Sequence, residues 1–197
     1  MINKLKKIKR ARAQAGFTLI ETLVAVLILA TAIAGPLTIA SRGLTTALVA
    51  KDQVTAFYLA QDAVEYIRFK RDSACLAAGV SPCDNAVWLS TLTPACTGSN
   101  GCYLDSTETT TNPPLNNGPL SCGAIPCSLS NHPLYYDPVN NRFTYTSLNN
   151  IRQPFVRTVI LTSVNSNEEK LSVTVSWNDT GGVPRSVSVN EDIFNWE

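Results

Sequence analysis

Histidine is almost absent from this chain of 197 residues, whose single example is His132. A lone histidine beside a proline does not support a nucleophile–histidine–acid set, and the sequence has no phosphate-binding glycine loop and no H-E-x-x-H motif. Calcium stays open as a minor alternative at Asp137, Asp179 and the acidic pair 168–169, although none has the D-x-D-x-D-G spacing of a calcium loop. We therefore expect no enzymatic activity, no cofactor and no metal ligand.

Clustered basic charge is also missing from most of the chain. The first 16 residues hold six of the 16 Lys and Arg and no acid: Lys4, Lys6, Lys7, Lys9, Arg10 and Arg12. The remainder has 10 basic residues against 15 acidic ones, a net charge of −5. A mildly acidic body lacks the basic surface that nucleic-acid binding requires, so no nucleic-acid partner is expected. The basic tail is expected to set membrane topology instead.

Cysteine is absent from residues 1–74 and 128–197. The six cysteines lie between these two regions: Cys75, Cys83, Cys96, Cys102, Cys122 and Cys127. An even number in a loop-rich stretch indicates disulfides formed in an oxidising compartment. The alternative is reduced thiols or a zinc site, but the sequence has no C-x-x-C pair, and its closest spacings are C-x5-C and C-x4-C. Six cysteines allow about 15 pairings, so their connectivity stays open.

A long apolar run follows the basic tail, from residue 17 to residue 40, with no basic residue before Arg42. As a helix these residues span about 36 Å, enough to cross a bilayer core of about 30 Å. The alternative of an ordinary signal peptide requires small residues after the apolar run. Here Ala13, Ala15 and Gly16 stand in front of it.

One acidic residue, Glu21, lies inside the apolar run. An acid within a membrane is costly and is by default a functional hypothesis. If the chain were cut between Gly16 and Phe17, the new α-amino group would be a cation four residues from Glu21. Glu21 would also lie near the positive end of the helix dipole. Pairing between Glu21 of one chain and the Phe17 amine of a neighbour would fix the register of assembly in an apolar environment.

The stretch GFTLIETLVAVLILA, from Gly16 to Ala30, resembles the prepilin signature of type IV pilins and type II secretion pseudopilins. In that family a membrane-embedded aspartyl peptidase cuts after the glycine and methylates the new amino-terminal phenylalanine. The resemblance implies cleavage after Gly16, N-methylation of Phe17 and the register role for Glu21. It also implies two kinds of partner, prepilin peptidase and other pilins or pseudopilins bound through the amino-terminal helix.

Gly35 and Pro36 lie near the outer end of the apolar run. Proline removes a helical hydrogen bond and glycine adds flexibility, so a helix break in the form of a kink or local melting is expected there. Beyond it the helix is predicted to continue as an amphipathic segment over residues 41–72. Its apolar stripe, which should pack on a sheet, consists of Val49, Ala56, Ala60, Val64 and Ile67.

The rest of the chain divides at about residue 132. Residues 73–132 are rich in Cys, Asn, Pro, Gly, Ser and Thr and are expected to be irregular, with an exposed loop at 107–119. Residues 133–197 alternate apolar and polar side chains and are expected to form an antiparallel sheet. The predicted strands are Arg142–Leu148, Phe155–Val164, Lys170–Trp177 and Arg185–Phe194. The segment NDTGGVP should turn the last two into a hairpin.

The predicted fold is α+β and type IV pilin-like: a long amino-terminal helix, membrane-inserted in its first half, packed on a sheet with a cysteine-rich loop. The expected segments are a cleaved leader (1–16), a filament-core helix (17–40), an outer helix (41–72), the loop region (73–132) and the sheet (133–197). The precursor is expected in the inner membrane as a single-pass protein with its head outside the cytoplasm, and later in a pilus or periplasmic filament.

The carboxyl-terminal strands, ending in VSW, RSVSV and NW, are similar to those of minor pilins in the type IV pilus modification group. This second resemblance favours a minor pilin that initiates, caps or modifies a pilus. One alternative is a minor pseudopilin of a type II secretion system. Another is a plain bitopic membrane protein with an extracellular binding head.

Overall fold

The computed structural model describes residues 16–78, 89, 92–106 and 120–195. The expected leader up to residue 15, Cys83 and the expected loop at 107–119 lie outside the described residues. The chain divides after Thr46 into two compact units, which are described separately below. The α+β class expected from the sequence is confirmed.

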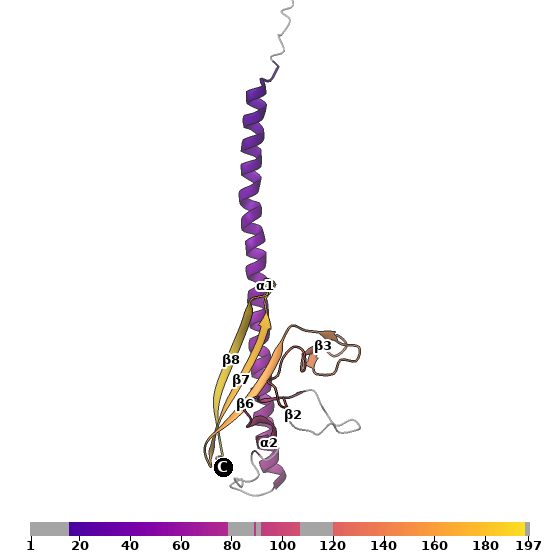
Figure 1. Cartoon of the computed structure of the whole chain (residues 1–197), viewed down its shortest axis with the longest axis vertical. Helices are drawn as coiled ribbons and strands as arrows, with labels where there is room; N and C mark the ends of the chain where they lie inside the picture. Colours follow the sequence, from indigo (N-terminus) through magenta and orange to yellow (C-terminus); the bar gives the residue numbers. More distant parts are fainter. Residues whose placement is uncertain (1–15, 79–88, 90–91, 107–119, 196–197) are drawn as a thin grey trace, which may run out of the picture. The chain divides into compact units, whose positions relative to one another are not determined.

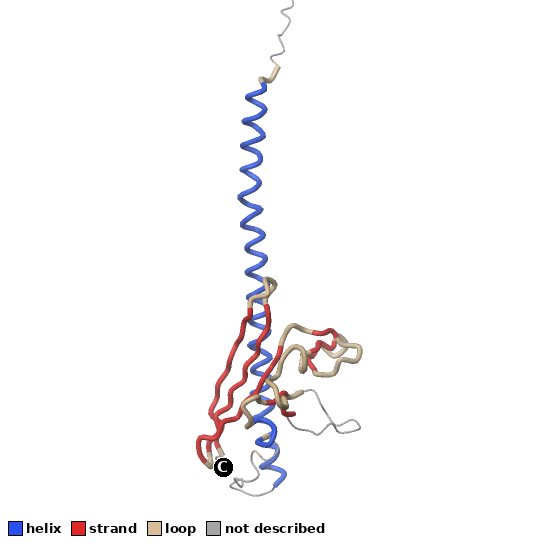
Figure 2. The backbone as a smooth tube through the Cα atoms, viewed as in Figure 1, coloured by secondary structure: helices blue, strands red, loops and turns tan. Residues whose placement is uncertain are grey.

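The first described element is the helix α1, Leu19–Ala78, of 60 residues (Figures 1 and 2). It runs beyond the expected end at residue 72, because the segment Ser73–Ala78 contains three alanines, which favour helix strongly. The helix is also continuous through Gly35 and Pro36, with the proline inside it, and the kink or local melting expected there stays a prediction. Proline removes a single hydrogen bond, and the neighbouring turns keep theirs. The Thr38 hydroxyl adds a bond by donating to the Ala34 carbonyl, at 2.8 Å.

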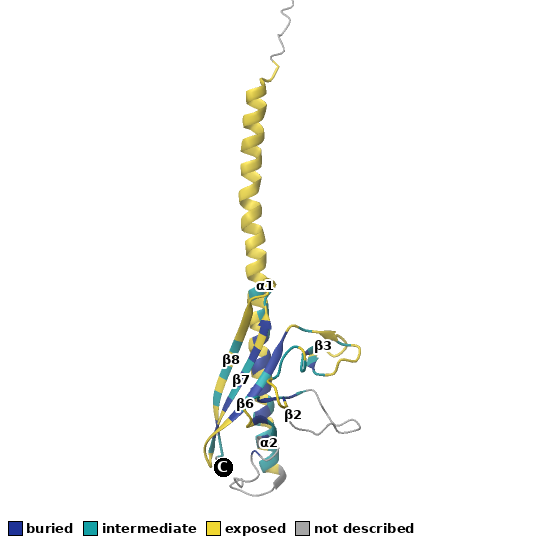
Figure 3. Ribbon diagram, viewed as in Figure 1, coloured by how far each residue is buried: buried dark blue, intermediate teal, exposed yellow. Residues whose placement is uncertain are grey.

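In the first unit every described residue, from Gly16 to Thr46, is exposed (Figure 3). The exposed side chains include large aliphatic ones throughout, such as Leu19 (79% exposed) and Leu27 (63%). This helix therefore has no packing partner within its own unit.

In the second unit α1 packs on a five-stranded antiparallel sheet of order β2-β1-β6-β7-β8. Its strands are β1 (Cys102–Tyr103), β2 (Leu120–Ser121), β6 (Val156–Asn165), β7 (Glu168–Asn178) and β8 (Pro184–Phe194). The hairpin predicted from NDTGGVP is confirmed, with β7 and β8 paired without interruption over their whole length. The central strand β7 alternates as expected, with Leu171, Val173, Val175 and Trp177 all buried.

The helical side of this core is the stripe predicted from the sequence. Ala56, Ala60, Val64 and Ile67 are buried, while Val49 is half-buried. The stripe is wider than predicted, because Leu59 and Ala63 are buried beside it. Small alanines on this face let the helix backbone approach the sheet closely.

The structure corrects the division of the second unit into an irregular region and one sheet. The cysteine-rich stretch supplies the short helix α2 (Thr93–Cys96) and the strands β1 and β2. A separate three-stranded sheet has the order β4-β3-β5, from β3 (Tyr135–Asp137), β4 (Arg142–Thr144) and β5 (Ile151–Arg152). The strand expected at Arg142–Leu148 ends early, because the chain turns at Ser147–Asn150 with Asn149 at a positive φ of 60°. Strands of two or three residues are too short to show alternation in a sequence.

Candidate processing and assembly site

The segment in front of α1 is non-helical and open to solvent. Gly16, Phe17 and Thr18 are all exposed, Phe17 by 80%, and the helix begins at Leu19. Among the described residues, apart from Gly16 and Phe17 themselves, no atom lies within 4 Å of the position that a Cβ on Gly16 would occupy. The backbone on both sides of the Gly16–Phe17 bond is therefore sterically accessible.

Thr18 is the N-cap residue of α1. Its carbonyl accepts hydrogen bonds from the Glu21 and Thr22 amides, at 3.1 and 3.2 Å, and its hydroxyl lies 3.4 Å from the Glu21 nitrogen. The sequence Thr18-Leu-Ile-Glu21 has the T-x-x-E spacing of a capping box, in which the acid at the third helical position supports the helix start. The sequence reasoning did not use this spacing, although it would have indicated the helix start at Thr18.

Glu21 is exposed in the first turn of α1, where the unpaired backbone amides favour negative charge. It is the one acid among the described residues from 16 to 46. The structure therefore brings Gly16, Phe17 and Glu21 to one end of the helix. Gly35 and Pro36 lie more than three turns further along it.

Residues 11–35 match the family model described as the prokaryotic N-terminal methylation motif. The chain carries a type IV prepilin-like signature. This motif indicates a type IV pilin- or pseudopilin-like protein, a class whose precursors are processed by prepilin peptidase and assemble with other pilins. No curated protein and no solved structure matches the chain significantly.

The prepilin-like signature lies at the start of a helix that fits a membrane. Within the described residues, α1 contains one segment long and apolar enough to cross a bilayer, near the amino terminus and with none of its most apolar window buried. A signal sequence near the amino terminus can also be long and apolar enough. The observation is therefore consistent with membrane anchoring, and the motif is needed to interpret it.

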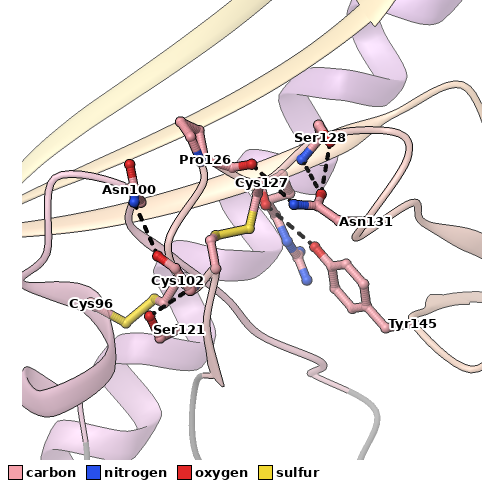
Figure 4. Close-up of a disulfide and its surroundings, with 12 residues drawn as sticks. Cys96, Asn100, Cys102, Ser121, Pro126, Cys127, Ser128, Asn131 and Tyr145 are labelled. Atoms are coloured by element: carbon pink, nitrogen blue, oxygen red, sulfur yellow. Dashed lines mark hydrogen bonds between the residues drawn. A yellow bond between two sulfur atoms is a disulfide. The ribbon is translucent and has the colours of Figure 1, made fainter.

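Away from this site, disulfides organise the cysteine-rich region (Figure 4). Cys96 pairs with Cys102 and Cys122 with Cys127, with Cα–Cα distances of 4.7 and 5.1 Å. Cys75 is also disulfide-bonded. The two small loops are linked to each other, since the Asn100 side-chain amide donates to the Gly123 carbonyl at 3.0 Å.

Gly101 lets the first of these loops lie against the sheet. Its φ is +71°, which side chains rarely tolerate, and a Cβ there would lie 2.6 Å from the Val159 carbonyl oxygen of β6. Cys102 pairs with Val159 in the sheet. The loop therefore requires glycine at this position for both its conformation and its close approach.

Arg157 is a buried residue that the sequence reasoning missed. Its guanidinium donates to the carbonyls of Leu59 in α1 and Leu104 after β1, at 2.9 and 2.6 Å, and to the Asp62 carboxylate at 2.7 Å. Burial alone lowers the pKa of Arg157, but nearby Tyr145 and Asp62 outweigh it and the pKa is raised. Arg157 therefore stays charged and ties the helix, the sheet and the cysteine-rich region together. A charged residue in an otherwise apolar strand pattern was the available signal.

The acids considered for calcium are engaged by their own turns. Asp137 accepts from the Val139 and Asn140 amides at 2.9 and 3.1 Å, and these bonds with the Asn140 side chain, which contributes most, hold its pKa below the usual range. Asp179 accepts from the Gly181 and Val183 amides, both at 2.9 Å, which likewise lowers its pKa. Among the described residues no cluster of three or more potential metal ligands occurs.

His132 is packed against an aromatic ring, with its centroid 4.2 Å from that of Tyr103. Burial lowers the pKa of His132, so the ring is neutral near pH 7. No acid or nucleophile is hydrogen-bonded to His132 among the described contacts, and its position indicates a packing role.

Proposed function

We propose that this protein is a minor pilin, a structural subunit that initiates, caps or modifies a type IV pilus. Prepilin peptidase cuts it after Gly16 and methylates Phe17, and the residues from 17 to 40 then join the helical core of the filament. The single observation that carries the proposal is the prepilin-like motif at the start of a helix whose first half is apolar and exposed.

The local geometry supports processing at this bond. A peptidase requires accessible, non-helical backbone, and Gly16 to Thr18 provide it. A cut after Gly16 leaves the N-cap, Thr18, inside the mature chain, so the helix start is preserved. The new amino group at Phe17 then lies next to the first turn, which contains Glu21.

The cut supplies a cation at the end of a helix that has an acid in its first turn. In the filament, Glu21 of one subunit pairs with the Phe17 amine of a neighbour and fixes the axial register. An apolar surrounding makes any unpaired partner costly. Pro36 and Gly35 leave one helical turn with a missing hydrogen bond, where the core helix can extend or melt during assembly.

The second unit favours a minor rather than a major subunit. Its sheet is supplemented by a second small sheet and by disulfide-closed loops, which is an elaborate head for a protein made in bulk. A minor pseudopilin of a type II secretion system would have the same helix and motif, and adjacent genes for pilus retraction or for secretion components distinguish the two. A plain bitopic binding protein would leave the motif without a use.

The first test is the intact mass and amino-terminal sequence of the full chain, produced in membranes with and without a prepilin peptidase. We expect the peptidase to remove 16 residues and leave Phe17 methylated. The matched variant Gly16→Leu, which places a bulky side chain at the cut, should keep its full length. A wild-type chain that stays uncut while a known prepilin is processed in the same cells would contradict the proposal.

The second test separates the two roles of Glu21. Glutamine also serves in a capping box, so Glu21→Gln keeps the helix start and removes the charge. We expect this variant to be processed normally but excluded from filaments, whereas Thr18→Ala, which removes the capping hydroxyl and retains the charge, should still be incorporated. Equal incorporation of Glu21→Gln and wild type would contradict a register role for the carboxylate.

A further inference from the structure

The last strand of the large sheet, β8, has an open edge. The order β2-β1-β6-β7-β8 leaves one side of β8 without a neighbouring strand (Figure 2). At its two ends the backbone hydrogen bonds show which residues face β7. The Asp179 backbone amide donates to the Val183 carbonyl at 3.0 Å, and the Asn195 backbone amide donates to the Asn167 carbonyl at 2.9 Å. Both contacts involve odd-numbered residues on the β8 side. Since the pattern alternates along an antiparallel pair, the even-numbered residues of β8 direct their backbone groups away from β7.

Two further contacts agree with this assignment. The hydroxyls of Thr174 and Ser188 lie 2.9 Å apart, as expected for a cross-strand pair that shares no backbone hydrogen bonds. The Phe194 carbonyl, at another even-numbered position, accepts from the Arg71 side chain of α1. Ser186, Ser188 and Asn190 thus present free N–H and C=O groups outward, and no backbone hydrogen bond reaches them from elsewhere in the described part of the chain.

This edge lacks most of the features that prevent strands from pairing with other chains. Proteins protect edges with bulges, prolines, charges or a covering element. The register of β8 with β7 is unbroken, and Pro184 stands at its first position. The central residues, SVSVN from 186 to 190, carry no charge, and Val187 and Val189 on the helix-facing side are only half-buried.

The sequence of β8 is complementary to itself. In an antiparallel pair of two β8 strands centred on Ser188, Arg185 of each copy lies opposite Glu191 of the other. Val187 lies opposite Val189, and Ser186 opposite Asn190. In this register the residues that exchange backbone hydrogen bonds between the two strands are all even-numbered. These are the residues whose backbone groups point outward from the sheet. β-branched pairs across strands are favourable. Arg185 and Glu191 already pair with Asp179 and Arg68 within the chain, so in the new pair they are complementary in sign but add less than two free charges would.

We propose that the open edge of β8 binds a second copy of this chain through antiparallel β8–β8 pairing about Ser188. The interface is isologous, because the same strand serves on both sides of a two-fold axis. The two sheets become one ten-stranded sheet. Because the two β8 strands run antiparallel, the two-fold axis makes the part of α1 after residue 47 run in opposite directions in the two copies. The contact therefore joins heads from two oppositely directed chains, not neighbours within one filament, where all chains point the same way.

Cysteine cross-linking of the purified full chain in detergent tests this register. At the two-fold axis the Cα atoms of the two Ser188 residues would be about 5.5 Å apart, within the range of a disulfide. The matched position Ser186, on the same exposed face, would be about 14 Å from its counterpart, because four residues along the strand add to the spacing between strands. We expect Ser188→Cys to form at least tenfold more disulfide-linked dimer than Ser186→Cys, with position 188 identified by peptide mapping. Association through the apolar helix would affect both variants equally, so it cannot produce a difference in dimer yield between positions 188 and 186.

A backbone variant provides a second measurement that needs no new cysteine. Ser188→Pro removes an outward N–H that the β7 pairing does not use, whereas Ser188→Ala retains it. We expect sedimentation in detergent to show at least a tenfold weaker head-dependent dimer for Ser188→Pro and no change for Ser188→Ala. Equal cross-linking at positions 186 and 188 would indicate parallel or random contact and overturn the proposal. Absence of cross-linked dimer for both variants would overturn it as well.

Discussion

The two halves of α1 belong to one continuous helix but have different surroundings. From residue 19 to residue 46 every residue is exposed, including all of its leucines, isoleucines and valines. From residue 47 onward a stripe of small and aliphatic side chains is buried against the sheet. Both halves are helical throughout, so the difference lies in what covers them. The outer half is covered by the protein's own sheet, while our proposal assigns the cover of the first half to the membrane and later to other subunits.

The largest expected effect comes from removing the charge that holds the outer half of α1 in place. Arg157→Leu leaves the Leu59 and Leu104 carbonyls without their donor and Asp62 without its ion pair. Because the arginine side chain is 3% exposed, we expect a loss of about 3 kcal/mol in the free energy of unfolding. Urea denaturation of the full chain in detergent, followed by near-UV circular dichroism, measures it.

The control for this variant is Arg142→Leu, on β4. Its guanidinium is half-exposed and lies 3.7 Å from Asp137, so we expect a change of about 0.5 kcal/mol or less. Equal effects at the two positions would show that Arg157 does not anchor the helix.

The second effect concerns the disulfide loop that lies against β6. Gly101→Ala must either strain a φ of +71° or move the loop away from the Val159 carbonyl. We expect a destabilisation of about 2 kcal/mol, measured by the same denaturation. The matched variant Gly98→Ala, in the same loop with open space around it, should change stability by less than about 0.5 kcal/mol. Similar results for both glycines would contradict the close approach.

The third prediction compares the two halves of the helix directly. Ala63 is fully buried against the sheet, whereas Ala32 is exposed. Ala63→Leu overpacks the core and should cost about 2 kcal/mol in head stability, while Ala32→Leu should leave head stability unchanged. A loss of head stability with Ala32→Leu would mean that the first half of α1 supports the head, against the comparison drawn above.

The smallest effect concerns the turn between β7 and β8. Hydrogen bonds from the Val183 and Gly181 amides, together with Arg185, lower the pKa of Asp179 in the folded state. A carboxyl group whose pKa falls on folding stabilises the folded state at pH values above its unfolded pKa of about 3.9. This stabilisation is lost as the pH falls through the pKa of the folded state. Asp179→Asn should therefore reduce stability at pH 7 and flatten its decline below pH ~4. A wild type and variant with parallel pH profiles would exclude this contribution.

Much of the fold was predictable because its signals are local. The apolar stripe of the outer helix and the alternation in β7 each repeat over several residues, and NDTGGVP marks its turn by composition. The second sheet was not predictable, since its strands of two or three residues acquire their conformation from partners far along the chain. The helix end was misplaced by six residues, because a cysteine and a serine among alanines resemble the loop that follows.

The candidate site was predictable in a different way. Gly16, Phe17 and Glu21 form a contiguous pattern, so no tertiary contact is needed to bring them together. The kink or local melting expected at Gly35 and Pro36 stays a prediction: the helix runs through both residues, because one lost hydrogen bond does not interrupt a helix whose adjacent turns remain intact. Arg157 illustrates the opposite case: its partners lie 98, 95 and 53 residues away, and no local pattern connects them.

The sequence by itself therefore determined the long helix, its apolar first half, the prepilin-like motif and the two long hairpin strands. Each depends on residues close together in the chain, where propensity and periodicity act. Only the tertiary structure decided which cysteines pair, where the buried arginine lies, and which edge of the sheet stays open. Those features depend on distances between segments far apart in sequence, which are set by how the core packs.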